Sequence, residues 1–129
     1  MAKTIHQEVS IAGSPKSVYE AIMSSEKFTA MTGGREAKIS AEAGGASTMF
    51  GGDIMSVNVE LVPGQRIVQA WRSKSWPAGV YSIAHFELTA AGKGTKVVFD
   101  QAGYPDGAHA SLETGWREMY WTPLNAILA

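Results

Sequence analysis

The sequence predicts a single α+β domain. In it, a curved antiparallel sheet of about six to seven strands wraps a long C-terminal helix, with two short helices after the first strand. Three observations indicate this fold class. The N-terminal residues have the pattern of one strand followed by two short helices. Residues 35–103 alternate with a period of two between glycine-rich turns, and the last twenty or so residues return to helical spacing.

The first strand and the two short helices are predicted from alternation and from capping residues. Residues 3–12 alternate between apolar and polar side chains, which is typical of a strand. Ser14 is a good N-cap, and Pro15 fits the first helical position, so a short helix is expected over residues 14–24. A second helix is expected over residues 24–34, with a serine cap at its start and two glycines at its end.

The middle of the chain predicts an antiparallel meander, because short alternating runs are separated by regular turn signals such as Pro63-Gly64. Strands are expected at 35–41, 46–51, 53–61, 65–72, 80–90 and 95–103. Alternation and the positions of the large apolar residues then give the inward faces. These faces are Ile67, Gln69 and Trp71; Ser82, Ala84, Phe86 and Leu88; and Thr95, Val97, Phe99 and Gln101.

The C-terminal helix has an unusually wide apolar face. Counted at 100° per residue from Trp116, its apolar residues span about 200°, whereas a helix packed on one side needs a stripe of about 100°. The centre of this arc holds Met119, Tyr120 and Ile127, and Trp121 lies on its flank. The helix should therefore contact two surfaces, or one surface and an open cavity. Pro123 is expected to bend it.

Composition excludes several classes of function. The chain has 129 residues, is 45% apolar and carries a net charge of −1, which favours one domain over 1–129 and argues against nucleic-acid binding. With no cysteine, disulfides and thiolate metal sites are excluded. The three histidines are far apart in the sequence, so no metal site and no cofactor is expected. No signal-peptide or membrane-spanning run is present, and a cytoplasmic protein is expected.

Several stretches of the chain together resemble one protein family. They are SPKSVYEAIMSSEKFTAMTGG at 14–34, ELVPGQRIVQAWR at 60–72, WPAGVYS at 76–82, GT at 94–95 and GWREMYWTPL at 115–124. In this order the chain resembles a single-domain member of the Hsp90-ATPase-activator-homologue family, within the START/Bet v 1-like superfamily. The resemblance implies the helix-grip fold. Members of that superfamily bind lipids, hydrophobic natural products and proteins, and some are enzymes.

The eukaryotic co-chaperones that give the family its name also carry a separate N-terminal domain, which makes much of the contact with Hsp90. We expect no such domain here. The leading expectation is non-catalytic binding of a small hydrophobic or amphipathic ligand in a cavity between helix and sheet. The alternative is a stress-related, co-chaperone-like interaction module whose partner is a chaperone or a second copy. A cavity enzyme is a third reading, disfavoured because no nucleophile–base pair is found.

The cavity would be lined by aromatic residues, with two buried amides as polar anchors for a ligand. The candidates are Phe50, Gln69, Trp71, Phe86, Phe99, Gln101, Trp116, Met119 and Tyr120. The alternative for the aromatic residues is ordinary core packing, and the alternative for the two glutamines is pairing with backbone groups or water.

Two further tryptophans are candidates for a partner surface. Trp76 lies in a loop next to Pro77, where it would contact a partner or fold back over the core edge. Trp121 would contact either a partner or the short helices near Phe28 and Met31.

Overall fold

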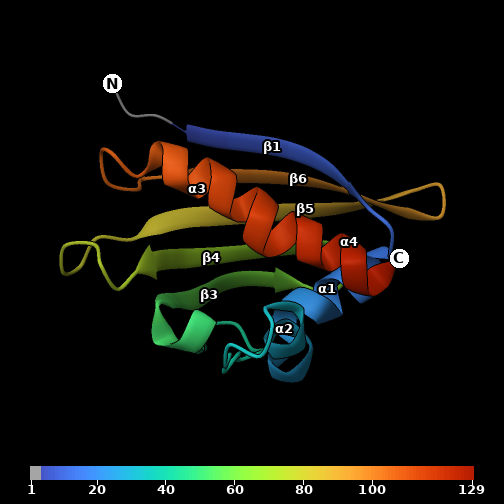
Figure 1. The fold of residues 1–129 in the computed structure, drawn as a ribbon, viewed down its shortest axis with the longest axis horizontal. Coiled ribbons are helices and arrows are strands. Elements are labelled where there is room, and N and C mark those ends of the chain that lie inside the picture. The colour runs from blue at the N-terminus through green and yellow to red at the C-terminus, as the bar shows by residue number, and fades with distance from the viewer. Residues whose placement is uncertain (1–3) are drawn as a thin grey trace.

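The computed structural model describes residues 4–129, and the chain forms one antiparallel sheet with helices on one face (Figure 1). The strands are β1 (Thr4–Ile11), β2 (Ala46–Met49), β3 (Ile54–Val62), β4 (Arg66–Ser73), β5 (Ser82–Ala91) and β6 (Gly94–Ala102). They are ordered β1-β6-β5-β4-β3-β2, and every pair is antiparallel. The predicted sheet, long C-terminal helix and two short helices are confirmed; residue 3 of the first predicted strand lies outside the described residues.

Two short helices follow β1 and cover one end of the sheet. They are α1 (Pro15–Met23) and α2 (Ser25–Met31). The Ser14 side chain accepts a hydrogen bond from the backbone N–H of Ser17, and the Ser24 side chain accepts one from Lys27. Each helix thus begins at a serine that satisfies a backbone donor left free at the first turn.

The predicted strand at 35–41 does not form, apart from a single bridge between Lys38 and Thr48. Its backbone N–H groups on the other side bond to side chains of α2: Ala37 N–H donates to Thr29 Oγ1, and Ile39 N–H donates to Ser25 Oγ. Because these groups are satisfied by hydroxyls, the segment joins α2 to the edge of the sheet instead of adding a strand.

The predicted strand at 46–51 ends early, at Met49, because the chain turns sharply there. Phe50 has a φ of 55°, and Gly51 and Gly52 follow with φ values of 68° and 96°. This turn is η1 (Phe50–Gly52). A left-handed phenylalanine is uncommon, and such residues are held in place by their surroundings.

The C-terminal helix runs across the inner face of the sheet in three consecutive parts (Figure 1). These are α3 (His109–Trp116), the π-helical turn η2 (Arg117–Trp121) and α4 (Thr122–Leu128). The Thr122 N–H bonds to the carbonyl of Arg117, five residues back, immediately before Pro123. The irregularity expected at Pro123 is therefore a widened turn that precedes it.

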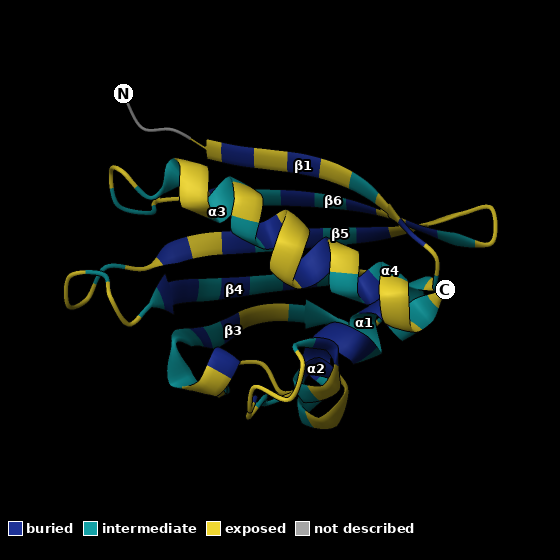
Figure 2. Ribbon diagram, in the orientation of Figure 1, coloured by how far each residue is buried: buried dark blue, intermediate teal, exposed yellow. Residues whose placement is uncertain are grey.

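The widened turn changes which side chains face the sheet. Trp116, Tyr120, Trp121 and Leu124 are buried, and the buried stripe of the helix is visible against the sheet in Figure 2. Met119 and Ile127, placed near the centre of the arc at a uniform 100° per residue, are 46% and 45% exposed. The regular count was wrong here because a π turn contains more residues than an α turn.

The inward faces predicted for β4, β5 and β6 are confirmed, since each of their residues is buried. The core between sheet and helix is rich in aromatic rings. Trp116 is at its centre, with ring centroids 4.1 Å from Phe99, 4.3 Å from Tyr120 and 5.3 Å from Trp71.

Candidate ligand-binding pocket

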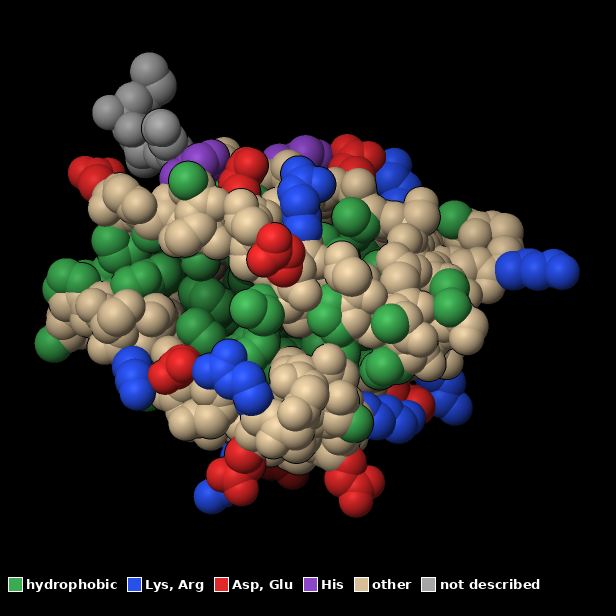
Figure 3. All heavy atoms as spheres, in the orientation of Figure 1, with side chains coloured by type: hydrophobic (Ala, Val, Ile, Leu, Met, Phe, Trp, Pro, Cys, Tyr) green, Lys and Arg blue, Asp and Glu red, His purple; other side chains and the backbone are tan. Residues whose placement is uncertain are grey.

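A pocket of about 220 Å³ opens between the C-terminal helix and the β3–β4 side of the sheet. The space-filling view shows a hollow of hydrophobic atoms below α3, with charged side chains beside it (Figure 3). The residues that line it are Arg35, Phe50, Asp53, Ile54, Trp71, Ser111, Leu112, Gly115, Trp116, Met119 and Tyr120. Most of these are apolar or aromatic, as expected for a small-molecule site.

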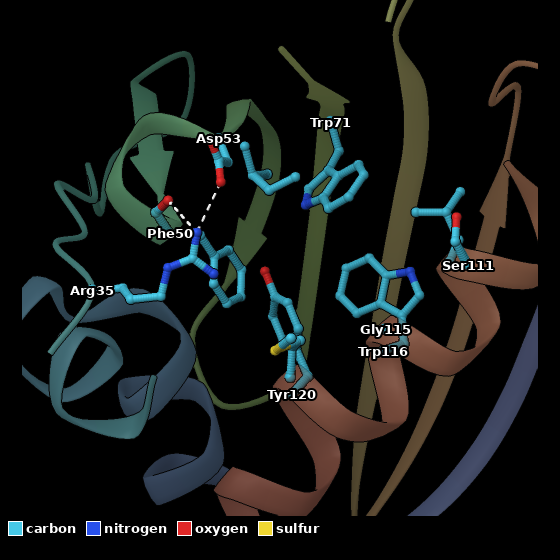
Figure 4. Close-up of a pocket in the computed structure, with 11 residues that line it drawn as sticks. Arg35, Phe50, Asp53, Trp71, Ser111, Gly115, Trp116 and Tyr120 are labelled. Carbon is cyan, nitrogen blue, oxygen red and sulfur yellow. Dashed lines mark hydrogen bonds and ion pairs between the residues drawn. The ribbon is translucent and has the colours of Figure 1, made fainter. Parts of the chain in front are cut away.

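The inner wall is formed by rings that belong to the core as well. Trp71 comes from β4, Trp116 and Tyr120 come from the C-terminal helix, and Phe50 comes from η1 (Figure 4). Phe28 of α2 packs edge-on against Phe50 and Tyr120 from behind, with centroids 5.4 Å and 5.3 Å away. Because these rings pack against further rings, the wall is held in one arrangement without a ligand.

Arg35 and Asp53 form the charged rim of the pocket. Arg35 Nη2 donates to the Phe50 carbonyl at 3.0 Å and to Asp53 Oδ2 at 2.8 Å, and the guanidinium lies 5.3 Å from the Phe50 ring centroid. Lys74 Nζ lies 3.0 Å from Asp53 Oδ1. Lys74 and then Arg35 lower the pKa of the Asp53 carboxyl, so it stays ionised. Arg35 thereby links the left-handed Phe50 to Asp53, the residue immediately before β3.

Gly115 leaves the pocket open from the side of the helix. It lies in α3, and a Cβ built on it would meet nothing within 4 Å. Neither a close backbone approach nor a left-handed conformation therefore requires glycine at this position. A glycine inside a helix is less favourable than alanine by about 1 kcal/mol, so this residue is costly for the helix while it enlarges the pocket.

Two buried polar groups of the pocket lack good partners. The Trp71 indole N–H has no hydrogen-bond partner among residues 4–129, although the side chain is only 4% exposed. The Tyr120 hydroxyl donates only to the Met49 sulfur, at 3.6 Å. Burial raises the pKa of Tyr120; the nearby Trp71 indole opposes this rise, but the two groups do not reach hydrogen-bond geometry. Both groups therefore remain donors at neutral pH.

The structure brings five of the nine predicted cavity residues to the pocket: Phe50, Trp71, Trp116, Met119 and Tyr120. The other four are buried elsewhere. Phe86 and Phe99 pack against each other beneath Trp116, with centroids 5.0 Å apart.

The two predicted polar anchors are occupied by protein partners. Gln101 accepts from Trp116 Nε1 at 2.8 Å and donates to Ser82 Oγ at 2.9 Å. Gln69 donates to Asn58 Oδ1 at 3.4 Å. Neither amide lines the pocket, because each is needed to satisfy another buried polar group.

The two tryptophans expected on a partner surface differ. Trp121 is 3% exposed, and its indole N–H donates to Gln7 Oε1 at 2.7 Å, so it belongs to the core and to no exposed patch. The widened turn moves it there from the flank of the helix. Trp76 is half-buried and packs on Trp71, with centroids 5.7 Å apart, so it folds back over the core edge.

Sequence reasoning missed the pocket residues that are neither aromatic nor on regular strands: Arg35, Asp53, Ile54, Ser111, Leu112 and Gly115. Gly115 carried a usable signal, since a glycine inside a predicted helix is unfavourable and indicates a packing or functional reason.

Residues 4–129 contain neither a metal-binding cluster nor a membrane-spanning helix. No group of three or more histidine, aspartate and glutamate side chains is placed to hold a metal ion. None of the helices in this range is long and apolar enough to cross a membrane.

Comparisons with known protein sequences identify one family. The family described as "Activator of Hsp90 ATPase homolog 1-like protein" matches residues 12–129. The "Activator of 90 kDa heat shock protein ATPase homolog" of Dictyostelium discoideum is 33% identical over 116 residues, which are 89% of this chain and 30% of that protein. The human homolog 1 is 28% identical over 108 residues, covering 84% of this chain and 32% of its own length. The chain thus spans about a third of these curated relatives.

The fold is shared with a solved structure described as an HSP90 activator from Plasmodium falciparum. The TM-score is 0.88 at 21% sequence identity, and the match covers 99% of this chain and 96% of that one. At this identity the likeness concerns the fold alone.

Proposed function

The chain belongs to the family of activator of Hsp90 ATPase homolog 1-like proteins, and within it we propose that this domain binds a small hydrophobic or amphipathic molecule, without catalysis, in the pocket between α3 and the sheet. The ligand would enter beside Met119 and lie against the rings of Trp71, Trp116 and Tyr120. Five residues that line the pocket are also candidates from the sequence: Phe50, Trp71, Trp116, Met119 and Tyr120.

Gly115 is the observation that carries this proposal. Aromatic rings that pack together are also expected in an ordinary core, so the rings alone do not favour a ligand site. A helical glycine with open space where its Cβ would lie is different, because alanine there would stabilise the helix and meet no neighbour. The glycine therefore supports a use for this space.

The volume limits the size of the ligand. Pockets that bury drug-sized molecules measure about 300–1,000 Å³, and a cavity of about 150 Å³ can hold benzene. At about 220 Å³, this pocket suits one ring with a short substituent, whereas a sterol would have most of its surface outside.

Thermal unfolding in the presence of candidate ligands tests the proposal. A compound that binds only the folded domain, present at 100 times its Kd, should stabilise it by about 2.7 kcal/mol and raise the Tm by roughly 10 °C. We expect single-ring aromatic compounds to produce this shift, and long-chain fatty acids and sterols to produce less. If no compound in the panel changes the Tm, the pocket is only a packing defect.

A second candidate function is a co-chaperone-like interaction with Hsp90. The observation that favours it is the similarity to relatives named as activators of the 90 kDa heat shock protein ATPase, which extends over 84–89% of this chain. The half-buried Trp76 loop is the remaining candidate surface, because Trp121 lies in the core.

Mixing the purified chain with purified Hsp90 tests this second function. An interaction should give a saturable signal in calorimetry that Trp76→Ala weakens by about tenfold or more, as a buried interface tryptophan does. Thr114→Ala, on an exposed part of α3, serves as a matched control. Absence of binding at concentrations of about 100 μM would leave only the small-molecule function.

A further inference from the structure

We propose, on the basis of the ligand-binding function above, that the ligand is a single-ring aromatic carboxylate. Its ring would pack against Trp71 and Trp116, and its carboxylate would accept hydrogen bonds from Tyr120 Oη, Trp71 Nε1 and the Arg35 guanidinium.

Two buried donors of the pocket lack a strong acceptor. The Trp71 indole is donor-only and is unpartnered within the described part of the chain, and the Tyr120 hydroxyl has only a thioether as acceptor. Figure 4 shows both groups directed into the same gap, which faces Arg35. Buried donors that lack acceptors are unfavourable, so a ligand that supplies an acceptor relieves this.

Arg35 has donors to spare at this gap. A guanidinium carries five N–H donors, and both hydrogen bonds that Arg35 makes here use Nη2 alone. Its position is fixed by those two bonds and by the Phe50 ring, so the remaining donors are presented without a search over rotamers. A bidentate contact with a carboxylate is the arrangement that a guanidinium favours.

The charge at the rim also favours an anion. Arg35 and Lys74 both contact Asp53, which gives two cations and one carboxylate, a net charge of +1. Each of the two Asp53 carboxylate oxygens pairs with one of these cations. The other polar side chain of the wall, Ser111, donates its hydroxyl to the carbonyl of Ala108. The pocket thus offers a ligand several donors, and no free carboxylate repels an anion.

The remaining lining accommodates the ring. Ile54 and Leu112 complete an apolar wall beside Trp71 and Trp116, and Gly115 leaves room for a flat group over the helix. The volume of about 220 Å³ fits a phenyl ring with a short acid substituent, such as the CH2–COO− group of phenylacetate, better than a fused or bicyclic acid.

Calorimetric titration with three probes tests the ligand class. We expect phenylacetate to bind the intact chain at least about tenfold more tightly than phenylacetamide or toluene, because hydrogen bonds to a charged group are stronger than neutral ones. Equal affinities for the three probes would overturn the carboxylate assignment while leaving a pocket that binds aromatic rings. Failure of all three to bind would overturn the proposed function itself.

Tyr120→Phe identifies the hydrogen-bonding group. This variant keeps the ring and loses only a hydroxyl bonded to sulfur, and we expect phenylacetate affinity to fall about tenfold with toluene affinity unchanged. Tyr81→Phe is the matched control, because Tyr81 is 45% exposed and outside the pocket, and it should change neither affinity. An equal loss for both probes in Tyr120→Phe would mean that the hydroxyl does not contact a carboxylate.

Arg35→Gln provides an independent check on the charge. It should lower the affinity for phenylacetate by tenfold or more and leave the affinity for toluene within about twofold of that of the unchanged chain. Arg66→Gln is the control, since Arg66 pairs with Glu60 and Glu87 away from the pocket. Unchanged phenylacetate binding in Arg35→Gln would contradict the proposal.

Discussion

Replacing Gly115 by leucine should lower the affinity for any pocket ligand by about a hundredfold or more, with the fold intact. The new side chain would project into the open space and occupy the volume that a ring needs. Leucine is also a better helix former than glycine by nearly 1 kcal/mol. The free energy of unfolding should therefore stay constant or rise by about 1 kcal/mol. Calorimetric titration with toluene and phenylacetate, together with urea unfolding, measures both quantities.

A matched variant separates pocket filling from a general effect on the helix. Thr114→Leu adds the same side chain one residue earlier, at an exposed position of α3, and should leave ligand affinity unchanged. Gly115→Ala should stabilise the helix and reduce affinity only modestly. Full ligand affinity in Gly115→Leu would show that ligands bind somewhere else.

Replacing Trp116 by alanine should lower the free energy of unfolding by about 3–5 kcal/mol. The side chain is 2% exposed, it contacts rings from β4, β5, β6 and the helix, and it satisfies Gln101. A domain of this size is stable by about 5–15 kcal/mol in total, so this loss would remove a large fraction of its stability. Urea unfolding followed by far-UV circular dichroism measures the loss.

Ile127→Ala is the control for this loss, because Ile127 lies on the same helix but is 45% exposed. It should cost less than about 1 kcal/mol. Trp116→Phe keeps much of the packing but leaves the Gln101 oxygen without its donor, so we expect an intermediate loss of about 1–3 kcal/mol. A small loss in Trp116→Ala would mean that the sheet and helix do not depend on this contact.

The sheet could be predicted from the sequence because each strand is indicated by the alternation of its own residues. Alternation in strands such as 65–72 and 95–103 assigns every side chain to one of two faces, and burial followed that assignment in β4, β5 and β6 except at Arg72, which is buried at an outward position. The Ser14-Pro15 helix start was equally local, since a cap needs only the three residues that follow it.

The parts that were mispredicted depend on contacts between distant segments. Residues 35–41 have the alternation of a strand, but Thr29 and Ser25 take up their backbone donors. The π turn before Pro123 moves Trp121 into the core, where Gln7 pairs with its indole. A count of 100° per residue contains no information about either event.

The pocket was predicted only in part, because its rim also depends on contacts between distant segments. Its aromatic wall could be inferred from large apolar residues on inward faces, whereas its rim depends on Arg35 reaching Asp53 across eighteen residues of chain. The amides were misassigned because a buried glutamine is equally suited to a ligand and to a neighbouring tryptophan. At Gln101 the partner is the tryptophan, because the Trp116 indole N–H donates to the Gln101 side-chain oxygen.

Titration of the four tryptophan indole N–H signals by NMR is the most direct test of a working pocket. Trp71 and Trp116 line the pocket, while Trp76 packs outside it and Trp121 is bonded to Gln7. With toluene or phenylacetate added, we predict saturable shifts that are largest for the Trp71 indole, and none of comparable size in Gly115→Leu. Signals that stay unchanged with both compounds, or that move equally in Gly115→Leu, would contradict a ligand site beneath this helix.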